Sequence, residues 1–424
     1  MNLTVLFGLL GGLLVLAFVA NLLFRRTRVP DVLVLMATGL VLGPVLGWVD
    51  PSRFEPVTHA FGTLALILIL FEGGLELNIR ETFRHFPGGL LLGVLAYGVT
   101  LTLVTLVAWR GLDLPVRSAL LVGAVLACTS SAIVLPVLQQ LKAREPVKVT
   151  LLIEASLGDV LGALTVGLLL ELPASGAPLA SGFVLGLLME VGISLLLAAL
   201  TGMLWSRLLP ILSEQRFWHV LTFSVVLLLY AGSQALHGNG LIAVLGFGLT
   251  LANFPGIDRR LVEATFGLEA PAVEHHQQIL TFHSELAFLM RTFFFVLLGL
   301  VVKLAGLGQY LLVTLGILGA ILLGRWLAVH ASRWAWREIG APERELVLWI
   351  LPRGLITAVL AVQVVEARGS ELAPLSTLAF AVILVTNLSV VLGSVRIRRH
   401  AAEAAPAAPA PVAAPAESGP PAGA

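Results

Sequence analysis

The sequence predicts an all-α polytopic membrane protein with about thirteen transmembrane helices. Of its 424 residues, 58% are hydrophobic and only 12% are charged, whereas soluble proteins carry about a quarter charged residues. The mean hydropathy is +0.97. Apolar runs recur at membrane-spanning length and lack the period-two alternation of a membrane β-barrel. These features exclude a soluble enzyme, and the net charge of +1 gives no reason to expect binding to nucleic acid.

The expected spans follow one another with short connections, and several are long enough to tilt. In order, they are residues 3–24, 31–49, 57–78, 88–109, 116–141, 149–171, 182–209, 217–236, 239–254, 285–306, 308–333, 344–366 and 371–395. No basic residue lies in the first four positions, so we do not expect a signal peptide.

The basic residues orient these spans. If the N-terminus lies outside, the connections on the cytoplasmic side hold 18 of the 26 lysines and arginines, and the opposite connections hold five. This distribution satisfies the positive-inside rule. We therefore expect a multi-pass protein of a bacterial inner membrane, in contact with lipid, with its N-terminus outside and its C-terminus in the cytoplasm.

Two segments outside the spans have distinct compositions. Residues 401–424 are mostly alanine and proline, which predicts a disordered cytoplasmic tail after a membrane domain of residues 1–400. Residues 255–284 form the longest internal connection and include His275, His276 and His283. We expect a solvated linker with an interfacial amphipathic part there. The alternative is a pH-responsive element, because histidine titrates near neutrality.

The sixth span carries two carboxylates, Glu154 and Asp159, within IEASLGDVLGAL. An ionisable group at this depth costs at least ~2.5–3.5 kcal/mol and usually marks an ion or proton path. Five helical residues turn the two side chains about 140° apart, so one can face a cavity and the other a fixed partner. Ser156 lies between them, and Gly158 leaves space beside Asp159. A structural polar pair that holds helices together is the alternative.

The fifth span has a polar centre. Within LACTSSAIVLPVL, Thr129, Ser130 and Ser131 are followed by Pro136, which leaves one carbonyl without its helical partner. Freed carbonyl and hydroxyl oxygens suit an alkali cation, as in transporters with discontinuous helices. Serine and threonine also pack helices closely without binding any ligand. This segment alone does not distinguish a cation site from helix packing.

The twelfth span is interrupted as well, because LPRGLITAVLA places a proline, an arginine and a glycine at mid-membrane depth. A buried guanidinium needs a carboxylate, and we expect Arg353 to pair with Glu154. If spans 1–6 and 8–13 are repeats, the fifth and twelfth spans occupy matching positions. The offset of seven spans makes such repeats inverted.

The remaining intramembrane charges are assigned to packing or to the membrane surface, with one exception. Glu72 lies one turn before Glu76 in span three and is a candidate to line a cytoplasmic funnel, whereas Glu76 is expected to be solvated at the interface. Glu190 and Arg325 have no evident partner, and Arg291 lies near a span end. For these three, helix packing or snorkelling is the cheaper interpretation.

Four segments in this order, LILFEGGLELN, LACTSSAIVLPVL, IEASLGDVLGAL and LPRGLITAVLA, resemble the monovalent cation/proton antiporter superfamily. The resemblance is to its NhaP/NHE-like sodium/proton exchangers and covers about residues 1–400. It implies two inverted six-helix repeats with interrupted crossing helices, and a homodimer in which a core domain carries the ion past a dimerisation domain. It implies no cofactor, only a transported monovalent cation and H⁺.

The resemblance also implies residue roles. Asp159 would bind the cation and the proton in turn. Thr129 would provide a backbone or hydroxyl ligand for the cation, with Ser130 and Ser156 as further candidates. Glu154 and Arg353 would form a buried structural ion pair.

The sequence departs from the family pattern at four positions near Asp159. Ser130 and Ser131 stand where the family has an aspartate and a proline. Gly158 replaces an asparagine or aspartate. Ala155 stands in the place of the usual serine, and Ser156 follows one position later. These departures concern the ligand set directly.

The expected function is secondary antiport of a monovalent cation, with Na⁺ as the expected ion, against H⁺. Asp159 cannot hold a cation and a proton together, so one carboxylate predicts electroneutral exchange. The alternatives are a K⁺/H⁺ antiporter, a proton-coupled carrier of an organic anion, a cation channel or uniporter, and a non-transporting membrane sensor. An enzyme is not expected, because no metal set or nucleophile with a base is recognisable.

Overall fold

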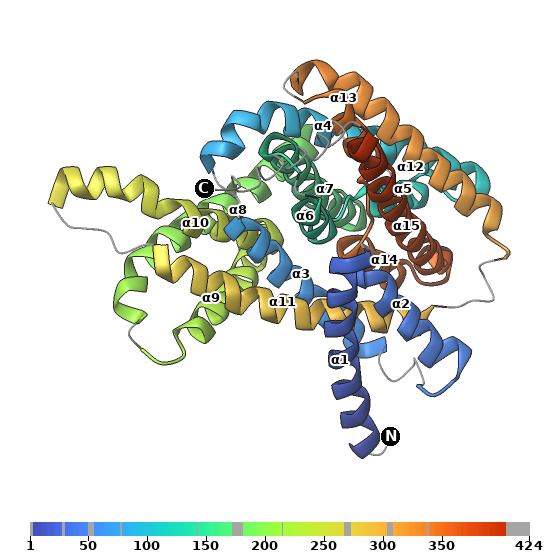
Figure 1. The fold of residues 1–424 in the computed structure, drawn as a ribbon, viewed down its shortest axis with the longest axis horizontal. Coiled ribbons are helices and arrows are strands. Elements are labelled where there is room, and N and C mark those ends of the chain that lie inside the picture. Colours follow the sequence, from blue (N-terminus) through green and yellow to red (C-terminus); the bar gives the residue numbers. More distant parts are fainter. Residues whose placement is uncertain are drawn as a thin grey trace, which may run out of the picture.

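The computed structural model describes residues 3–27, 30–49, 55–76, 79–141, 143–171, 181–213, 215–266, 273–302, 308–336 and 339–403, and every regular element in these ranges is helical. The α-helices, drawn in Figure 1, are α1 (Leu3–Thr27), α2 (Asp31–Leu40), α3 (Glu55–Glu76), α4 (Ile79–Gly111), α5 (Val116–Ala127), α6 (Ser131–Gln140), α7 (Glu145–Glu171), α8 (Ser181–Leu212), α9 (Trp218–Ala235), α10 (Gly240–Phe266), α11 (Val273–Val301), α12 (Leu311–Ser332), α13 (Ala341–Trp349), α14 (Leu355–Arg368) and α15 (Pro374–Glu403). A π-helical turn, Val41–Val45, extends α2.

The predicted membrane character is confirmed for the described residues. Seven helices there are long and apolar enough to cross a bilayer, and five further apolar helices are shorter. Among the shorter ones are Val116–Ala127 and Gly240–Asn253. The total of thirteen crossings stays a prediction.

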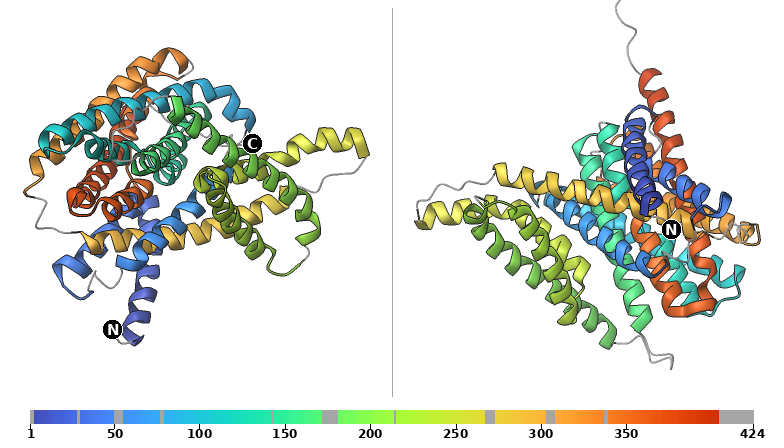
Figure 2. Two further views of the ribbon diagram at one scale, coloured as in Figure 1. Left: turned by 180° about the vertical axis from the view of Figure 1, so that it is seen from behind. Right: turned by 90° about the horizontal axis from the view of Figure 1, so that it is seen from below.

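The helices form two groups (Figures 1 and 2). Helices α8, α9 and α10 gather on one side, α5–α7 and α12–α15 on the other, and α3 and α11 run between them. A hydrophobic cluster with Phe71, Trp205, Trp218 and Phe247 joins α3, α8, α9 and α10, while a larger cluster fills the other group. The second group contains both interrupted spans.

Two glycine pairs let neighbouring helices approach closely. A Cβ atom placed on Gly39 of α2 would lie 3.0 Å from the Cα of Gly299 in α11, and one on Gly74 of α3 would lie 3.1 Å from that of Gly248 in α10. The predicted six-helix repeats, offset by seven spans, would pair α2 with α10 and α3 with α11. Under that pairing, the contact between α2 and α11 corresponds to the contact between α10 and α3. The repeat itself stays a prediction.

Both predicted interruptions occur. Helix α5 ends at Ala127 and α6 begins at Ser131, while α13 ends at Trp349 and α14 begins at Leu355. The first break lies at the polar residues, and Pro136 falls inside α6. The breaks touch each other, because the backbone N–H of Ser130 donates to the carbonyl of Pro352 at 2.8 Å.

The expected linker at residues 255–284 is wrong in most of its length. Helix α10 continues to Phe266 and α11 begins at Val273, so the connection is much shorter. His283 lies within α11, fully buried beside Phe71, and is not solvated. At the C-terminus, α15 runs to Glu403, and the predicted tail from residue 404 onward lies outside the described residues.

Candidate ion-binding site

Four helix ends meet where the two breaks touch. The N-termini of α6 and α14 carry partial positive charge, and the C-termini of α5 and α13 carry partial negative charge. Unpaired backbone groups at these ends need partners, because no water is available in an apolar interior. Charged side chains from α7 and α12 provide some of them. The break residues Cys128, Thr129 and Ser130 are all buried.

Asp159 lies against the N-terminus of α6. Its Oδ2 accepts a hydrogen bond from the Ser131 hydroxyl at 2.7 Å and a long one from the Ser131 backbone N–H at 3.5 Å. Its other oxygen, Oδ1, is buried and has no hydrogen-bond partner among the described residues. Asp159 as a residue is 4% exposed. A carboxylate with one free oxygen at a helix N-terminus is a chemically competent cation and proton acceptor.

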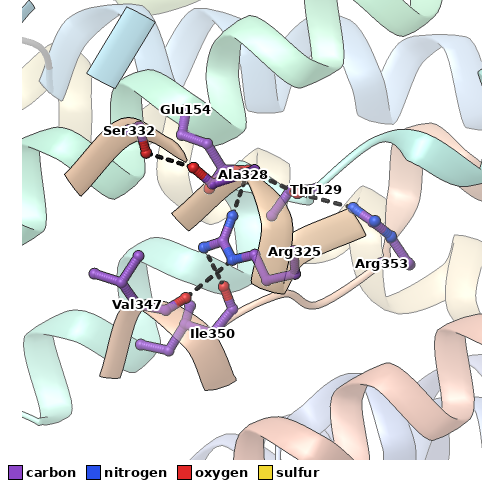
Figure 3. A network of polar contacts seen from close by, with 8 residues as sticks. All are labelled: Thr129, Glu154, Arg325, Ala328, Ser332, Val347, Ile350 and Arg353. Atoms are coloured by element: carbon purple, nitrogen blue, oxygen red, sulfur yellow. Dashed lines mark hydrogen bonds and ion pairs between the residues drawn. The ribbon is translucent and has the colours of Figure 1, made fainter. Parts of the chain in front are cut away.

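Glu154 does not pair with Arg353 as expected. Its ion pair is with Arg325 of α12, whose Nη1 lies 3.0 Å from Oε1, and both side chains are almost completely buried (Figure 3). Arg325 also donates to the carbonyls of Val347 and Ile350 at the end of α13. It therefore neutralises a buried carboxylate and caps the broken twelfth span. These contacts join helices, in agreement with the expected packing role, whereas snorkelling is wrong because Arg325 is buried.

Arg353 reaches Glu154 only through Thr129. Its Nη1 donates to the Thr129 hydroxyl at 2.8 Å, and that hydroxyl donates to Glu154 Oε1 at 2.9 Å (Figure 3). Thr129 thus joins an arginine and a carboxylate from different elements. Its hydroxyl, expected as a cation ligand, is used within the protein here.

Helix α15 holds the second break in place. The Thr386 hydroxyl accepts the Arg353 N–H at 3.0 Å, and the Asn387 amide donates to the Arg353 carbonyl at 2.8 Å. Both side chains are buried. The sequence analysis missed these residues together with the role of Ser131. A threonine–asparagine pair in an apolar span was the available signal for the first two.

The other predicted site residues make fewer side-chain contacts at the breaks. Ser130 contributes its backbone, and its side chain packs against Gly354, where a Cβ atom would collide with it. Ser156 and Glu72 are half-buried in α7 and α3. The funnel role of Glu72 and the ligand role of Ser156 stay predictions.

Two further intramembrane charges have partners. Arg291 lies 3.8 Å from Asp31 across α11 and α2. Glu190 accepts a hydrogen bond from the Asn239 amide at 3.2 Å, at the start of α10. Both interactions join neighbouring helices, in agreement with packing for Glu190. For Arg291, the ion pair replaces the expected snorkelling.

The donor set favours an alkali cation over a transition metal. In the described ranges, no three His, Cys, Asp or Glu side chains cluster as metal ligands. The oxygens near the breaks are carboxylate, hydroxyl and carbonyl groups, which bind hard cations.

Comparison with known proteins identifies the family of this chain. The sequence profile of the family "Sodium/hydrogen exchanger, transmembrane" matches residues 13–399. The chain is 27% identical over 378 residues to Na(+)/H(+) antiporter 1 of Methanocaldococcus jannaschii, covering 86% of this chain and 84% of the relative. It is 28% identical over 391 residues to K(+)/H(+) antiporter NhaP2 of Shewanella oneidensis. That match covers 90% of this chain but only 64% of the relative, so the chain spans less than two thirds of the potassium antiporter.

The fold is similar to solved antiporter structures. A structure of the sodium proton antiporter MjNhaP1 from Methanocaldococcus jannaschii at pH 8 superposes with a TM-score of 0.74 at 23% identity, covering 95% of this chain and 98% of that one. A second structure of the same antiporter gives a TM-score of 0.72 at 26% identity, with 95% and 97% coverage. The family match spans nearly the whole chain, including both broken helices and the carboxylates of α7. The chain therefore belongs to the sodium/hydrogen exchanger family.

Proposed function

We propose that this protein exchanges a monovalent cation for a proton across the membrane, with Asp159 as the shared binding group. The observation that carries the proposal is the free, buried Oδ1 of Asp159 at the point where two broken helices touch. A cation and a proton exclude each other there, because protonation removes the charge that attracts the cation. Competition at one carboxylate couples the two fluxes when the protein alternates between its two faces.

Electroneutral exchange follows from the charge count. Glu154 is held in an ion pair with Arg325, so Asp159 is the carboxylate left to titrate at the breaks. One carboxylate releases one proton for each monovalent cation it binds. Thr129 then acts through its backbone and through the hydrogen bonds that link Arg353 to Glu154, and it has a hydroxyl ligand role only if those bonds open. Ser130 and Ser156 remain candidate ligands.

Sodium is the proposed cation, and potassium is the second candidate. The relative matched over more of its own length, 84% against 64%, is named a Na(+)/H(+) antiporter, whereas several others are named K(+)/H(+) antiporters. The two ions differ in radius by tenths of an ångström, so ligand spacing decides between them. Direct comparison of the two ions is therefore part of the test.

We also propose the inner membrane of a bacterium as the location, with the N-terminus outside and residues 401–424 as a cytoplasmic tail. The distribution of lysine and arginine supports this orientation. A homodimer is proposed as well. Helix α8 presents exposed apolar side chains, including Leu188, Leu196 and Leu204, that need lipid or a second copy to cover them.

The test is cation-driven proton movement in proteoliposomes that carry a pH gradient. Addition of Na⁺, K⁺ or Li⁺ is expected to collapse the gradient for the wild-type protein. Asp159→Asn keeps the size of the side chain, removes the proton site and is expected to abolish the exchange. Glu343→Gln, at the partly exposed ion pair with Arg144, is the control and keeps it. Full proton-coupled exchange by Asp159→Asn overturns the proposal.

A further inference from the structure

Ser131 is the first residue of α6 and makes both hydrogen bonds that the structure gives to Asp159. Its hydroxyl donates to Oδ2 at 2.7 Å, and its backbone N–H points to the same oxygen at 3.5 Å. Ser131 is 9% exposed and Asp159 is 4% exposed, so water does not replace these donors freely. The result is an asymmetric carboxylate, with one oxygen occupied and one free.

The chemistry of Ser131 is specific to its residue type. The family pattern noted above has a proline at this position, and proline has neither a hydroxyl nor a backbone N–H. Both donors to Asp159 would therefore be missing with that residue. The neighbouring Gly158 supplies no side-chain donor either.

The other titratable groups around Asp159 have partners of their own and make no hydrogen bond to it. Glu154 of α7 is paired with Arg325 of α12. Arg353, in the second break, donates to Thr129. Cys128, in the first break, donates to the carbonyl of Ala124. Ser131 is therefore the direct hydrogen-bond donor to this carboxylate among the described residues.

We propose that Ser131 is a positioning residue that sets the balance between cation and proton at Asp159. Its hydroxyl holds Oδ2, so the carboxylate offers Oδ1 alone to the ion. A hydrogen bond to an ionised carboxylate is stronger than one to the protonated acid, so the hydroxyl favours the charged form that binds the cation. This inference rests on the proposed exchange at Asp159 and adds the residue that tunes it.

The test compares Ser131→Ala with Ser131→Thr in proteoliposomes. Ser131→Ala removes the hydroxyl, so the proton competes better and the pH of half-maximal Na⁺-driven exchange rises by about one unit, a tenfold change in competition. The apparent KM for Na⁺ on the acid side rises by a similar factor. Ser131→Thr retains the hydroxyl and restores the wild-type profile. Ser224→Ala, at a half-buried serine of α9 whose hydroxyl bonds within its own helix, is the matched control without a shift.

Each outcome separates this inference from the proposed function. A Ser131→Ala protein with the wild-type pH profile overturns the role of Ser131, even if Asp159→Asn abolishes exchange. A uniform loss of rate at every pH, without a displaced profile, overturns it too, because that is the effect of a purely structural residue. If Ser131→Ala does not fold, Ser131→Gly removes the same hydroxyl. Its pH profile is then compared with the wild-type profile by the same criteria. Exchange that persists in Asp159→Asn instead overturns the proposed function.

Discussion

For a single buried residue such as Glu154, the packing of distant helices decides which charged side chain becomes its partner. The sequence holds two arginines deep in spans, Arg325 and Arg353, and one carboxylate that needs a countercharge. Helical spacing relates residues within one span but does not give the distance between spans. Helices α12 and α7 both pack against α4, and this arrangement brings Arg325 to 3.0 Å from Glu154. Arg353 reaches the same carboxylate through the Thr129 hydroxyl.

Arg325→Met is expected to destabilise the protein strongly. The substitution leaves the buried Glu154 carboxylate without a countercharge. It also removes the donors to the carbonyls of Val347 and Ile350 at the end of α13. Breaking one partner of a buried ion pair costs ~3–5 kcal/mol. Thermal unfolding in detergent, followed by tryptophan fluorescence, measures the loss.

Two further variants make this measurement specific to the buried pair. Arg144→Met breaks the more exposed pair with Glu343, so its effect stays within ~1 kcal/mol. The double variant Arg325→Met with Glu154→Leu recovers part of the loss, because the carboxylate that lost its countercharge is then absent as well. A wild-type unfolding temperature for Arg325→Met alone would contradict the assigned pair.

At the scale of helices, the interruptions were predictable and the helix lengths were not. The Thr129–Ser131 segment and the LPRG segment break helices through their own chemistry, so sequence is sufficient there. The charged residues after Asn253 suggested a loop. A helix satisfies its backbone internally and continues past an apolar region, so α10 extends to Phe266.

Gly354→Ala is expected to separate the two breaks. A Cβ atom at Gly354 would collide with the Ser130 side chain and lie 2.9 Å from the Ile133 Cδ1 atom. Relief requires the breaks to move apart and weakens the bond from Ser130 to Pro352, at a cost of ~1–3 kcal/mol. Exchange in proteoliposomes is expected to fall at least tenfold.

Gly319→Ala is the matched control for this substitution. Beyond the adjacent backbone of its own helix, no atom lies within 4 Å of a Cβ at Gly319 in α12. Alanine favours a helix over glycine by ~0.5–1 kcal/mol. Its exchange rate and unfolding temperature are therefore expected to equal or exceed the wild-type values. Equal rates for both glycine variants would show that the close contact at Gly354 does not matter for transport.

At the scale of the whole molecule, composition was sufficient for the fold class, because an apolar surface of this extent is compatible only with a bilayer. The candidate site was predictable in part. Asp159 and Thr129 were located by the cost of burying polar groups in lipid. Ser131, Thr386 and Asn387 act through contacts between helices distant in sequence, and such contacts follow from the assembled bundle rather than from any one span.

The charge moved in one complete cycle is a property of the whole molecule, and the wild-type protein is expected to move none. A net elementary charge would add ~2.3 kcal/mol of driving force per 100 mV. With one carboxylate exchanging one cation for one proton, Na⁺-driven proton efflux is expected to be equal at zero and at imposed potentials. Valinomycin with defined K⁺ gradients sets the potential in this assay.

Gly158→Asp provides the positive control for voltage dependence, because it adds a second carboxylate beside the first break. A Cβ at Gly158 meets the Thr129 backbone nitrogen at 3.5 Å, an ordinary van der Waals contact, so the position accepts a side-chain carbon. If both carboxylates release protons for one cation, the cycle moves a net charge and its rate depends on voltage. Gly158→Asn has nearly the same shape without the charge and stays insensitive. A voltage-dependent wild-type rate would mean that a second group, with Glu154 the nearest carboxylate, titrates during the cycle, and the ion pair with Arg325 would then have to open as the protein changes face.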